Sequence, residues 1–243
     1  MKISVIIPVY NSRDYIKDTL ISVINQSLKP FEIIIINDCS SDDTINEIIP
    51  LIKNTHGINI VLLNNISNLG VAASRNHGIL NARGDYLAFC DSDDIWHKDK
   101  LYIQSPFLLN YSIVGGCYNT FNNLKNPIKT IKLNGQYKYK DFLTENYIAM
   151  SSVILNKNNL DITSDLFESV FHEDYLFWLK LLKKNKNMEV LILPNILLSW
   201  VRKYINFPIT TATFGLVSIS STSFNNLFAS TKSSSASIDT NSV

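Results

Sequence analysis

The sequence predicts an α/β protein with a mainly parallel sheet flanked by helices, followed by a smaller mixed portion. Short apolar runs rich in isoleucine and valine alternate with segments of helical spacing over residues 3–100, and the connections between them are short. Hydrophobic residues make up 46% of the 243 residues, enough to bury a sizeable core. Alternating strands and helices with short connections predict parallel strands joined by right-handed crossovers.

Four apolar runs are predicted to be strands, and the first and fourth to be buried strands. The fourth run lacks the alternation of polar and apolar residues that marks a strand with one wet face, so both its faces should be covered. The predicted strands are residues 3–9, 32–36, 58–63 and 86–90. The carboxyl ends of parallel strands form the ligand crevice of an open α/β sheet, so the polar residues that end these strands should lie together.

Helices are predicted between the strands. Ser12 can cap the first, whose apolar residues recur at helical spacing. Asp42 and Asp43 open the second, where they complement the helix dipole, and Pro50 should kink or end it early. The third is expected over residues 71–81.

The second half is predicted to be less regular. We expect a helix over residues 99–109 that is limited by Pro106. Strands are expected over 113–118 and 150–155, a surface hairpin or loop over 125–139, a helix over 172–182 and a strand from Leu198. From residue 210 to 243, 16 of 34 residues are Ser or Thr. That composition is typical of an irregular or disordered tail, which we place at residues 206–243.

Composition excludes several classes of protein. The 22 basic residues nearly cancel the 21 acidic ones, so no nucleic-acid partner is expected. The three cysteines show no metal-ligand spacing, which indicates a reduced, cytoplasmic protein. No apolar run reaches the ~18 residues of a membrane span, and the first residues lack signal-peptide features, so no transmembrane segment is expected.

Three carboxylates follow the fourth strand within four positions, at Asp91, Asp93 and Asp94. Three carboxylates this close together repel one another unless a cation, with the phosphates of a substrate bound to it, lies between them. Oxygen ligands suit Mg²⁺ or Mn²⁺, which take one or two carboxylates plus substrate phosphates. The alternative is a solvated acidic turn.

Polar residues at the other strand ends also allow two interpretations each. Asp38 could accept hydrogen bonds from a base or ribose, or it could cap the next helix. Tyr10 could stack on a base or pack in the core. Arg75 could face a pyrophosphate or lie on an exposed helix face.

Several short motifs occur in a characteristic order. They are residues 4–11 (SVIIPVYN), 32–38 (EIIIIND), 68–70 (NLG), 73–78 (ASRNHG), 84–87 (GDYL) and 91–94 (DSDD). With these motifs, residues 3–100 resemble the family 2 glycosyltransferases, inverting enzymes of the GT-A fold. Two positions depart from the family pattern: Asn37 stands where many relatives carry aspartate, and Cys39 replaces a frequent glycine, so the turn should form without a residue free to take a positive φ.

The resemblance implies a nucleoside-diphosphate-sugar donor, a UDP-sugar above all. Asp38 would contact the base, Tyr10 would lie beside its ring, and Asp93, together with Asp91, would hold Mg²⁺ or Mn²⁺. The remaining implied donor-site residues are Pro8, Asn11, Arg75 and Ser92.

Glu173 and Asp174 open the helix predicted over residues 172–182. Taken alone, such a pair is more often a complement to the helix dipole. The resemblance implies instead that Asp174 is the general base of an inverting displacement and Glu173 its supporting neighbour. No Gln-x-x-Arg-Trp motif follows, which favours addition of one sugar over processive synthesis.

The resemblance also implies an arrangement of the chain and a setting for it. Residues 1–110 would bind the donor, and residues 111–205 would supply the acceptor side and the base. The acceptor would be a glycan or lipid-linked oligosaccharide of cell-envelope polysaccharide biosynthesis, with peripheral association at the inner face of the membrane.

Two other functions lack the motifs that they need in this sequence. A nucleotidyltransferase needs a Gly-rich basic loop after the first strand, and a dinucleotide oxidoreductase needs Gly-x-Gly-x-x-Gly; residues 8–11 (PVYN) are neither. A non-catalytic sugar-nucleotide-binding protein stays open as an alternative.

Overall fold

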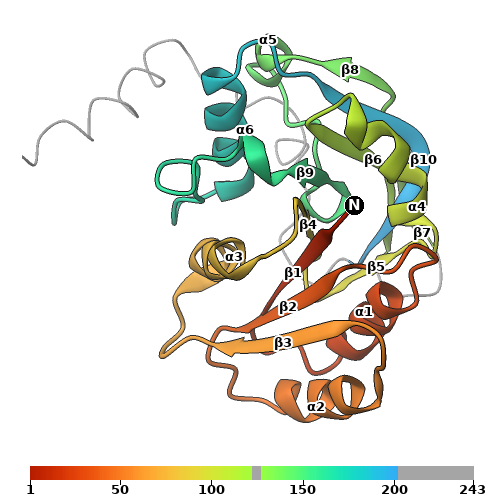
Figure 1. Ribbon diagram of the computed structural model, residues 1–243, viewed down its shortest axis with the longest axis vertical. Helices are drawn as coiled ribbons and strands as arrows, with labels where there is room; N and C mark the ends of the chain where they lie inside the picture. The colour runs from red at the N-terminus through yellow and green to blue at the C-terminus, as the bar shows by residue number, and fades with distance from the viewer. Residues whose placement is uncertain (122–126, 202–243) are drawn as a thin grey trace, which may run out of the picture. The chain divides into compact units, whose positions relative to one another are not determined.

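The computed structural model describes residues 1–121 and 127–201, which lie in one compact unit, Met1–Tyr204. Ten strands of these residues form one sheet in the order β3-β2-β1-β4-β9-β6-β10-β5, with β7 beside β6 and β8 beside β10 (Figure 1). The first four strands are β1 (Ile3–Val9), β2 (Glu32–Asn37), β3 (Asn59–Asn64) and β4 (Tyr86–Phe89). They pair in parallel, which confirms the predicted α/β class.

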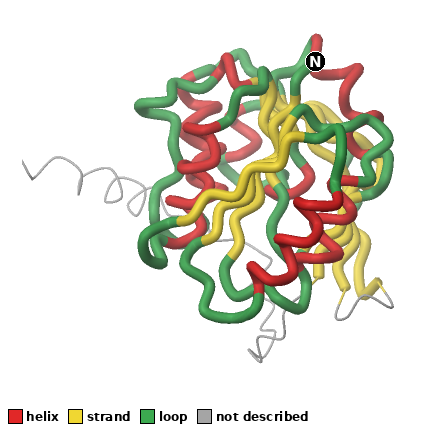
Figure 2. Tube along the Cα trace, turned by 60° about the horizontal axis from the view of Figure 1, so that its bottom comes forward, coloured by secondary structure: helices red, strands yellow, loops and turns green. Residues whose placement is uncertain are grey.

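Helices cover both faces of this sheet, because alternate residues of each strand point to opposite sides (Figure 2). Ile6 and Ile34 pack with α3 and α6, whereas Val5 and Ile33 pack with α1 and α2. The helices are α1 (Ile16–Ile24), α2 (Thr44–Asn54), α3 (Gly70–Asn81) and α6 (Glu173–Lys184). A continuous apolar strand sequence thus fills two cores at once.

The second half completes the sheet rather than forming a separate one. β9 pairs antiparallel with β4 and β6, and β10 then runs parallel to β6 and antiparallel to β5. The strands are β5 (Asp94–Trp96), β6 (Ile113–Phe121), β7 (Pro127–Ile131), β8 (Gly135–Tyr137), β9 (Ile154–Asn156) and β10 (Val190–Val201). Short helical segments are α4 (Lys100–Gln104), η1 (Ser105–Leu109), α5 (Tyr139–Phe142), η2 (Met150–Ser152) and η3 (Lys157–Asn159).

The helix expected over 99–109 is limited near Pro106, as predicted: the chain changes to 3₁₀ geometry at Ser105, because Pro106 has no N–H to donate. Three other predictions about this half were wrong in detail. The strand expected over residues 150–155 begins only at Ile154, because Met150–Ser152 is a 3₁₀ turn. The strand expected from Leu198 begins earlier, at Val190. Residues 127–137 do not form a hairpin, because β7 pairs with β6 and β8 pairs with β10.

Two local predictions in the first half were also wrong. Pro50 does not end α2 early: the helix runs to Asn54, with Pro50 exposed and Ile48 buried. Freed carbonyls on a solvent-facing side can be hydrated, which makes such a proline tolerable. Ser12 does not cap α1 with its hydroxyl, which instead contacts Ser92 and the Tyr10 carbonyl.

No helix in the described part of the chain is both long and apolar enough to cross a membrane. The predicted division at residues 110 and 205 concerns the roles of the two halves and stays a prediction. The predicted tail, residues 206–243, lies outside the described residues.

We predict that Gly84→Ala will destabilise the fold by about 1–3 kcal/mol, because the new methyl group would overpack a closed site. A Cβ there would lie 2.6 Å from Ser4 Oγ and 2.8 Å from the Lys2 carbonyl oxygen. Urea unfolding followed by circular dichroism measures the loss. The neighbouring control Asp85→Ala removes an exposed side chain and should change stability by less than about 0.5 kcal/mol; equal effects would contradict the packing argument.

Candidate active site

A pocket of about 440 Å³ opens where β1, β2 and β4 end. Its lining residues are Pro8, Val9, Tyr10, Asp38, Asn68, Gly70, Val71, Ser74, Arg75, Asp91, Ser92, Asp93 and Glu173. The structure therefore brings the predicted donor-side residues together, apart from Asn11. Of the predicted base pair, Glu173 lines the pocket and Asp174 does not.

The pocket also includes residues to which the sequence reasoning gave no role. Asn68, Gly70, Val71 and Ser74 belong to the turn before α3 and to its first turns. Gly70 has a φ of 86°, a conformation that favours glycine. The sequence signal for these residues was a glycine at the start of a predicted helix that follows a strand, because anions often bind at such helix N-termini.

Asp38 caps a helix, although not the one expected. Its Oδ1 accepts hydrogen bonds from the Asn65 amide nitrogen at 2.7 Å and from the Leu69 N–H at 2.9 Å, and its Oδ2 accepts from the Gly70 N–H at 2.8 Å. The expected alternative was a cap on α2, whereas this carboxylate ties the end of β2 to the start of α3. Asp38 is buried yet lines the pocket.

The loops after β1 and β2 hold each other in place. Asn11 Oδ1 accepts a hydrogen bond from the Ser41 N–H at 2.8 Å, so Asn11 acts between the loops rather than in the pocket lining. Tyr10 is 46% exposed, which rules out core packing. Cys39 has a φ of 62°, so the expectation that this turn avoids a positive φ was wrong. A non-glycine residue in this region costs about 1 kcal/mol, which the surrounding contacts must offset.

The acidic loop after β4 is anchored on three sides. The Asp91 N–H donates to Ser151 Oγ at 2.9 Å, the hydroxyls of Ser92 and Ser12 lie 2.6 Å apart, and Thr19 Oγ1 donates to the Ser92 carbonyl at 3.0 Å. These contacts come from η2, the β1 loop and α1. The loop is thereby fixed with Asp91 and Asp93 at the pocket.

The donor set of this loop fits a hard divalent cation. Asp91 and Asp93 offer only carboxylate oxygens, the ligands that Mg²⁺ and Mn²⁺ accept. Among the described residues, no group of three His, Cys, Asp or Glu side chains is arranged to hold an ion alone. Two carboxylates suit an ion whose remaining ligands are water and substrate phosphates.

Arg75 is buried between two carboxylates. Its Nη2 donates to Asp91 Oδ1 at 2.7 Å and its Nη1 donates to Glu173 Oε1 at 2.6 Å. Burial alone would lower the pKa of Arg75, but the two carboxylates outweigh it and the pKa is raised. Arg75 therefore joins the acidic loop to the start of α6, and it does not lie on an exposed helix face.

Asp174 is a half-buried carboxylate beside this bridge. Burial raises its pKa, and the neighbouring charge of Glu173 raises it further. Its Oδ1 accepts from the Tyr175 N–H at 2.8 Å. A carboxylate with a raised pKa next to a pocket is suited to accept a proton. His172, which precedes this pair, adopts a φ of 59°.

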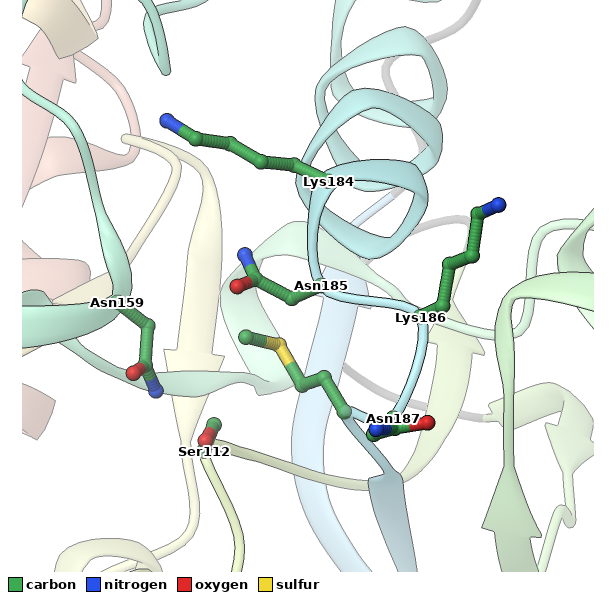
Figure 3. Close-up of a pocket in the computed structure, with 7 residues that line it drawn as sticks. Ser112, Asn159, Lys184, Asn185, Lys186 and Asn187 are labelled. Carbon is green, nitrogen blue, oxygen red and sulfur yellow. The ribbon is translucent and has the colours of Figure 1, made fainter.

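A second pocket, of about 380 Å³, is lined by Ser112, Asn159, Met188 and residues 184–187 (Figure 3). The side chains of Lys184 and Lys186 point away from one another (Figure 3). Lys184 Nζ already contacts Asp161 and Asp165, at 3.3 and 3.1 Å. No predicted site residue lines this pocket, so the first pocket is the candidate active site.

Comparisons with known proteins point the same way. The model of the family "Glycosyl transferase family 2" matches residues 4–154. The chain is 34% identical over 186 residues to an uncharacterized glycosyltransferase of Haemophilus influenzae, covering 76% of this chain and 73% of that one. It is 32% identical over 185 residues to the Escherichia coli glucosyltransferase WfgD, covering 75% and 70%.

A solved structure shows a similar fold. The Staphylococcus aureus TarS 1–349 chain in complex with UDP matches with a TM-score of 0.68 at 24% identity, covering 84% of this chain. This chain spans 61% of that TarS chain. The match supports a GT-A-type arrangement of the central sheet.

We predict that Arg75→Ala will lower the free energy of unfolding by about 2–4 kcal/mol, because it leaves two partly buried carboxylates without their shared cation. The matched control is Arg13→Ala, which removes an exposed arginine paired with the exposed Asp14. Exposed pairs contribute at most about 1 kcal/mol. Urea unfolding of both variants tests this, and a similar small loss in each would contradict a structural bridge at Arg75.

Proposed function

The chain belongs to glycosyltransferase family 2, and from this premise we propose that it is a metal-dependent inverting enzyme that transfers one sugar from a nucleoside-diphosphate sugar to an acceptor hydroxyl. The observation that carries the proposal is the convergence of Asp38, Asp91, Asp93 and Glu173 on one pocket at the carboxyl edge of the sheet. Fold alone would not decide function, since similar sheets serve many reactions.

In the proposed donor site the nucleotide lies across the ends of β1 and β2. Tyr10 offers an exposed ring for stacking on a base, and Asp38 lies at the pocket wall beside it. The start of α3 borders the same space through Gly70 and Val71, while its Leu69 and Gly70 N–H groups donate to Asp38. A UDP-sugar is the proposed donor, in keeping with the UDP bound by the similar TarS chain.

Asp93, together with Asp91, would hold Mg²⁺ or Mn²⁺. When bound, such an ion supplies positive charge that stabilises the departing diphosphate. In the structure Arg75 Nη2 donates a hydrogen bond to Asp91 Oδ1, which keeps that carboxylate oriented. The neighbouring Ser92 is fixed by Ser12 and Thr19, which limits movement of the loop.

Asp174 is the proposed general base. It accepts the proton of the acceptor hydroxyl as that oxygen forms a bond to the anomeric carbon. The bond from the anomeric carbon to the diphosphate oxygen breaks on the opposite side, and its electron pair leaves with the nucleoside diphosphate. One displacement inverts the configuration and needs no protein nucleophile. Glu173 supports the base indirectly, because it holds Arg75 at the start of α6.

The proposed acceptor is a glycan or a lipid-linked oligosaccharide. WfgD is a UDP-Glc:α-D-GlcNAc-diphosphoundecaprenol β-1,3-glucosyltransferase, and the similarity to it supports an acceptor of this class. Such an acceptor would bring the protein to the inner face of the membrane.

We predict that UDP binds in the presence of Mn²⁺ and much more weakly in EDTA, and that Asp93→Ala weakens the Mn²⁺-dependent binding at least about tenfold. Isothermal titration measures both effects. Asp18→Ala, at an exposed position of α1, is the control and should bind like the wild type. Equal binding with and without metal would sink the cation assignment while leaving the nucleotide site intact.

We predict that Asp174→Asn lowers kcat by about 10²- to 10⁴-fold, because an amide cannot accept the proton. Affinity for UDP should stay within about twofold, since Asp174 does not line the donor pocket. Release of UDP from a UDP-sugar panel, with a diphosphate-linked N-acetylglucosamine lipid as acceptor, gives kcat. Nucleotide binding without turnover by the wild type across this panel would favour a non-catalytic binding protein.

A further inference from the structure

Asn146, between α5 and η2, contacts the proposed base. Its Nδ2 donates to Asp174 Oδ2 at 3.4 Å, and its Oδ1 accepts from the Ile148 N–H at 3.1 Å. A backbone N–H can only donate, so this second contact determines that the amide oxygen faces Ile148 and the amide nitrogen faces Asp174.

We propose that Asn146 is a positioning residue for Asp174, holding the carboxylate at the orientation in which it receives the acceptor's proton. This inference rests on the proposed role of Asp174. The last torsion of an aspartate is broad, so packing alone leaves the carboxylate free to rotate. The Tyr175 N–H holds Oδ1 at 2.8 Å and Asn146 holds Oδ2, so one donor fixes each oxygen.

The segment that carries Asn146 is itself fixed against α6. The Tyr175 hydroxyl donates to the Phe142 carbonyl oxygen. Tyr147 stacks on Tyr137 with ring centroids 4.3 Å apart and meets Phe142 edge-on at 5.6 Å. Asn146 is thus held by aromatic contacts on the residue that follows it, and α6 carries both Asp174 and the tyrosine that anchors the segment.

Several charges already act on Asp174. Burial and Glu173 raise its pKa, Arg75 lowers it, and Asp91 raises it, while Tyr118 of β6 lies within range of the Asp174 charge. Glu145, which precedes Asn146, also acts on Tyr118. A hydrogen bond from a neutral amide favours the charged carboxylate, so removing it should raise the pKa of Asp174.

The decisive variant is Asn146→Asp. It keeps an oxygen that can accept from the Ile148 N–H, but replaces the donating nitrogen with an acceptor beside Asp174. Asn146→Ala removes both contacts. The control is Asn185→Ala, at the far end of α6, where the side chain donates to the Leu181 carbonyl. Circular dichroism establishes that each variant is folded.

The measurement is a pH titration of the full-length protein labelled with ¹³C at the aspartate carboxyl carbons, without nucleotide, with Asp174→Asn used to assign the resonance. We expect the Asp174 pKa to rise by about 0.5–1 unit in Asn146→Ala. It should rise further in Asn146→Asp, where a second carboxylate repels the first, and stay unchanged in Asn185→Ala. An unchanged pKa in folded Asn146→Asp overturns the proposal.

A kinetic comparison separates this proposal from the proposed function. If Asn146 positions the base, Asn146→Ala lowers kcat about tenfold or more while the KM for the donor changes little. If Asn146→Ala loses the same amount of kcat/KM only through a higher KM for the donor, with kcat unchanged, the positioning role is overturned. The two proposals can also fail separately. If the Asp174 pKa shifts in the Asn146 variants but the wild type transfers no sugar, the contact between Asn146 and Asp174 stands and the role of Asp174 as base is overturned.

Discussion

The contact on which the site depends is the pair of hydrogen bonds that Arg75 makes to Asp91 and Glu173. The two acids come from different parts of the chain, one after β4 and one at the start of α6. Without a shared cation they would repel each other across the pocket. A guanidinium can serve both at once because its planar fork presents several donors, whereas a lysine ammonium is a single point charge on a flexible stem.

The two cores bring that contact about. α3 and α6 pack on the same face of the sheet, so the residue in the middle of α3 and the first residue of α6 can reach the same strand end. Asp38 adds a second link, since its carboxylate holds the start of α3 to the end of β2. One helix, α3, thus lies between the proposed donor site at Asp91 and the start of α6 that carries the proposed base, so its Arg75 can contact both Asp91 and Glu173.

The sequence predicted the first half of the fold well, because runs of isoleucine at strand positions and apolar residues at helical spacing are local signals. Tyr10, Asp38 and the acidic loop at residues 91–93 were also predictable, since each follows a strand, whereas Arg75 and Glu173 lie on helices and were indicated by the family motifs instead. What the sequence could not indicate were partners far away in the chain: Asp38 bonds to α3 instead of the helix next to it, and Arg75 bonds to Glu173. The positive φ of Cys39 was likewise not indicated by its residue type, because a cysteine has no preference for that region.

The sheet order has a consequence for folding kinetics. β4 and β5 flank the acidic loop, yet β9 supplies the second neighbour of β4, and β5 pairs with residues of β10 near Trp200. The strands on either side of the Asp91 loop therefore gain these neighbours only after β9, which ends at Asn156, and β10, which ends at Val201, have been synthesised and have paired. Contacts of such long sequence separation form late and slowly, because loop closure must precede them. During synthesis the donor-side strands can pair before the catalytic edge exists, which makes β4 a temporary open edge exposed to misassociation.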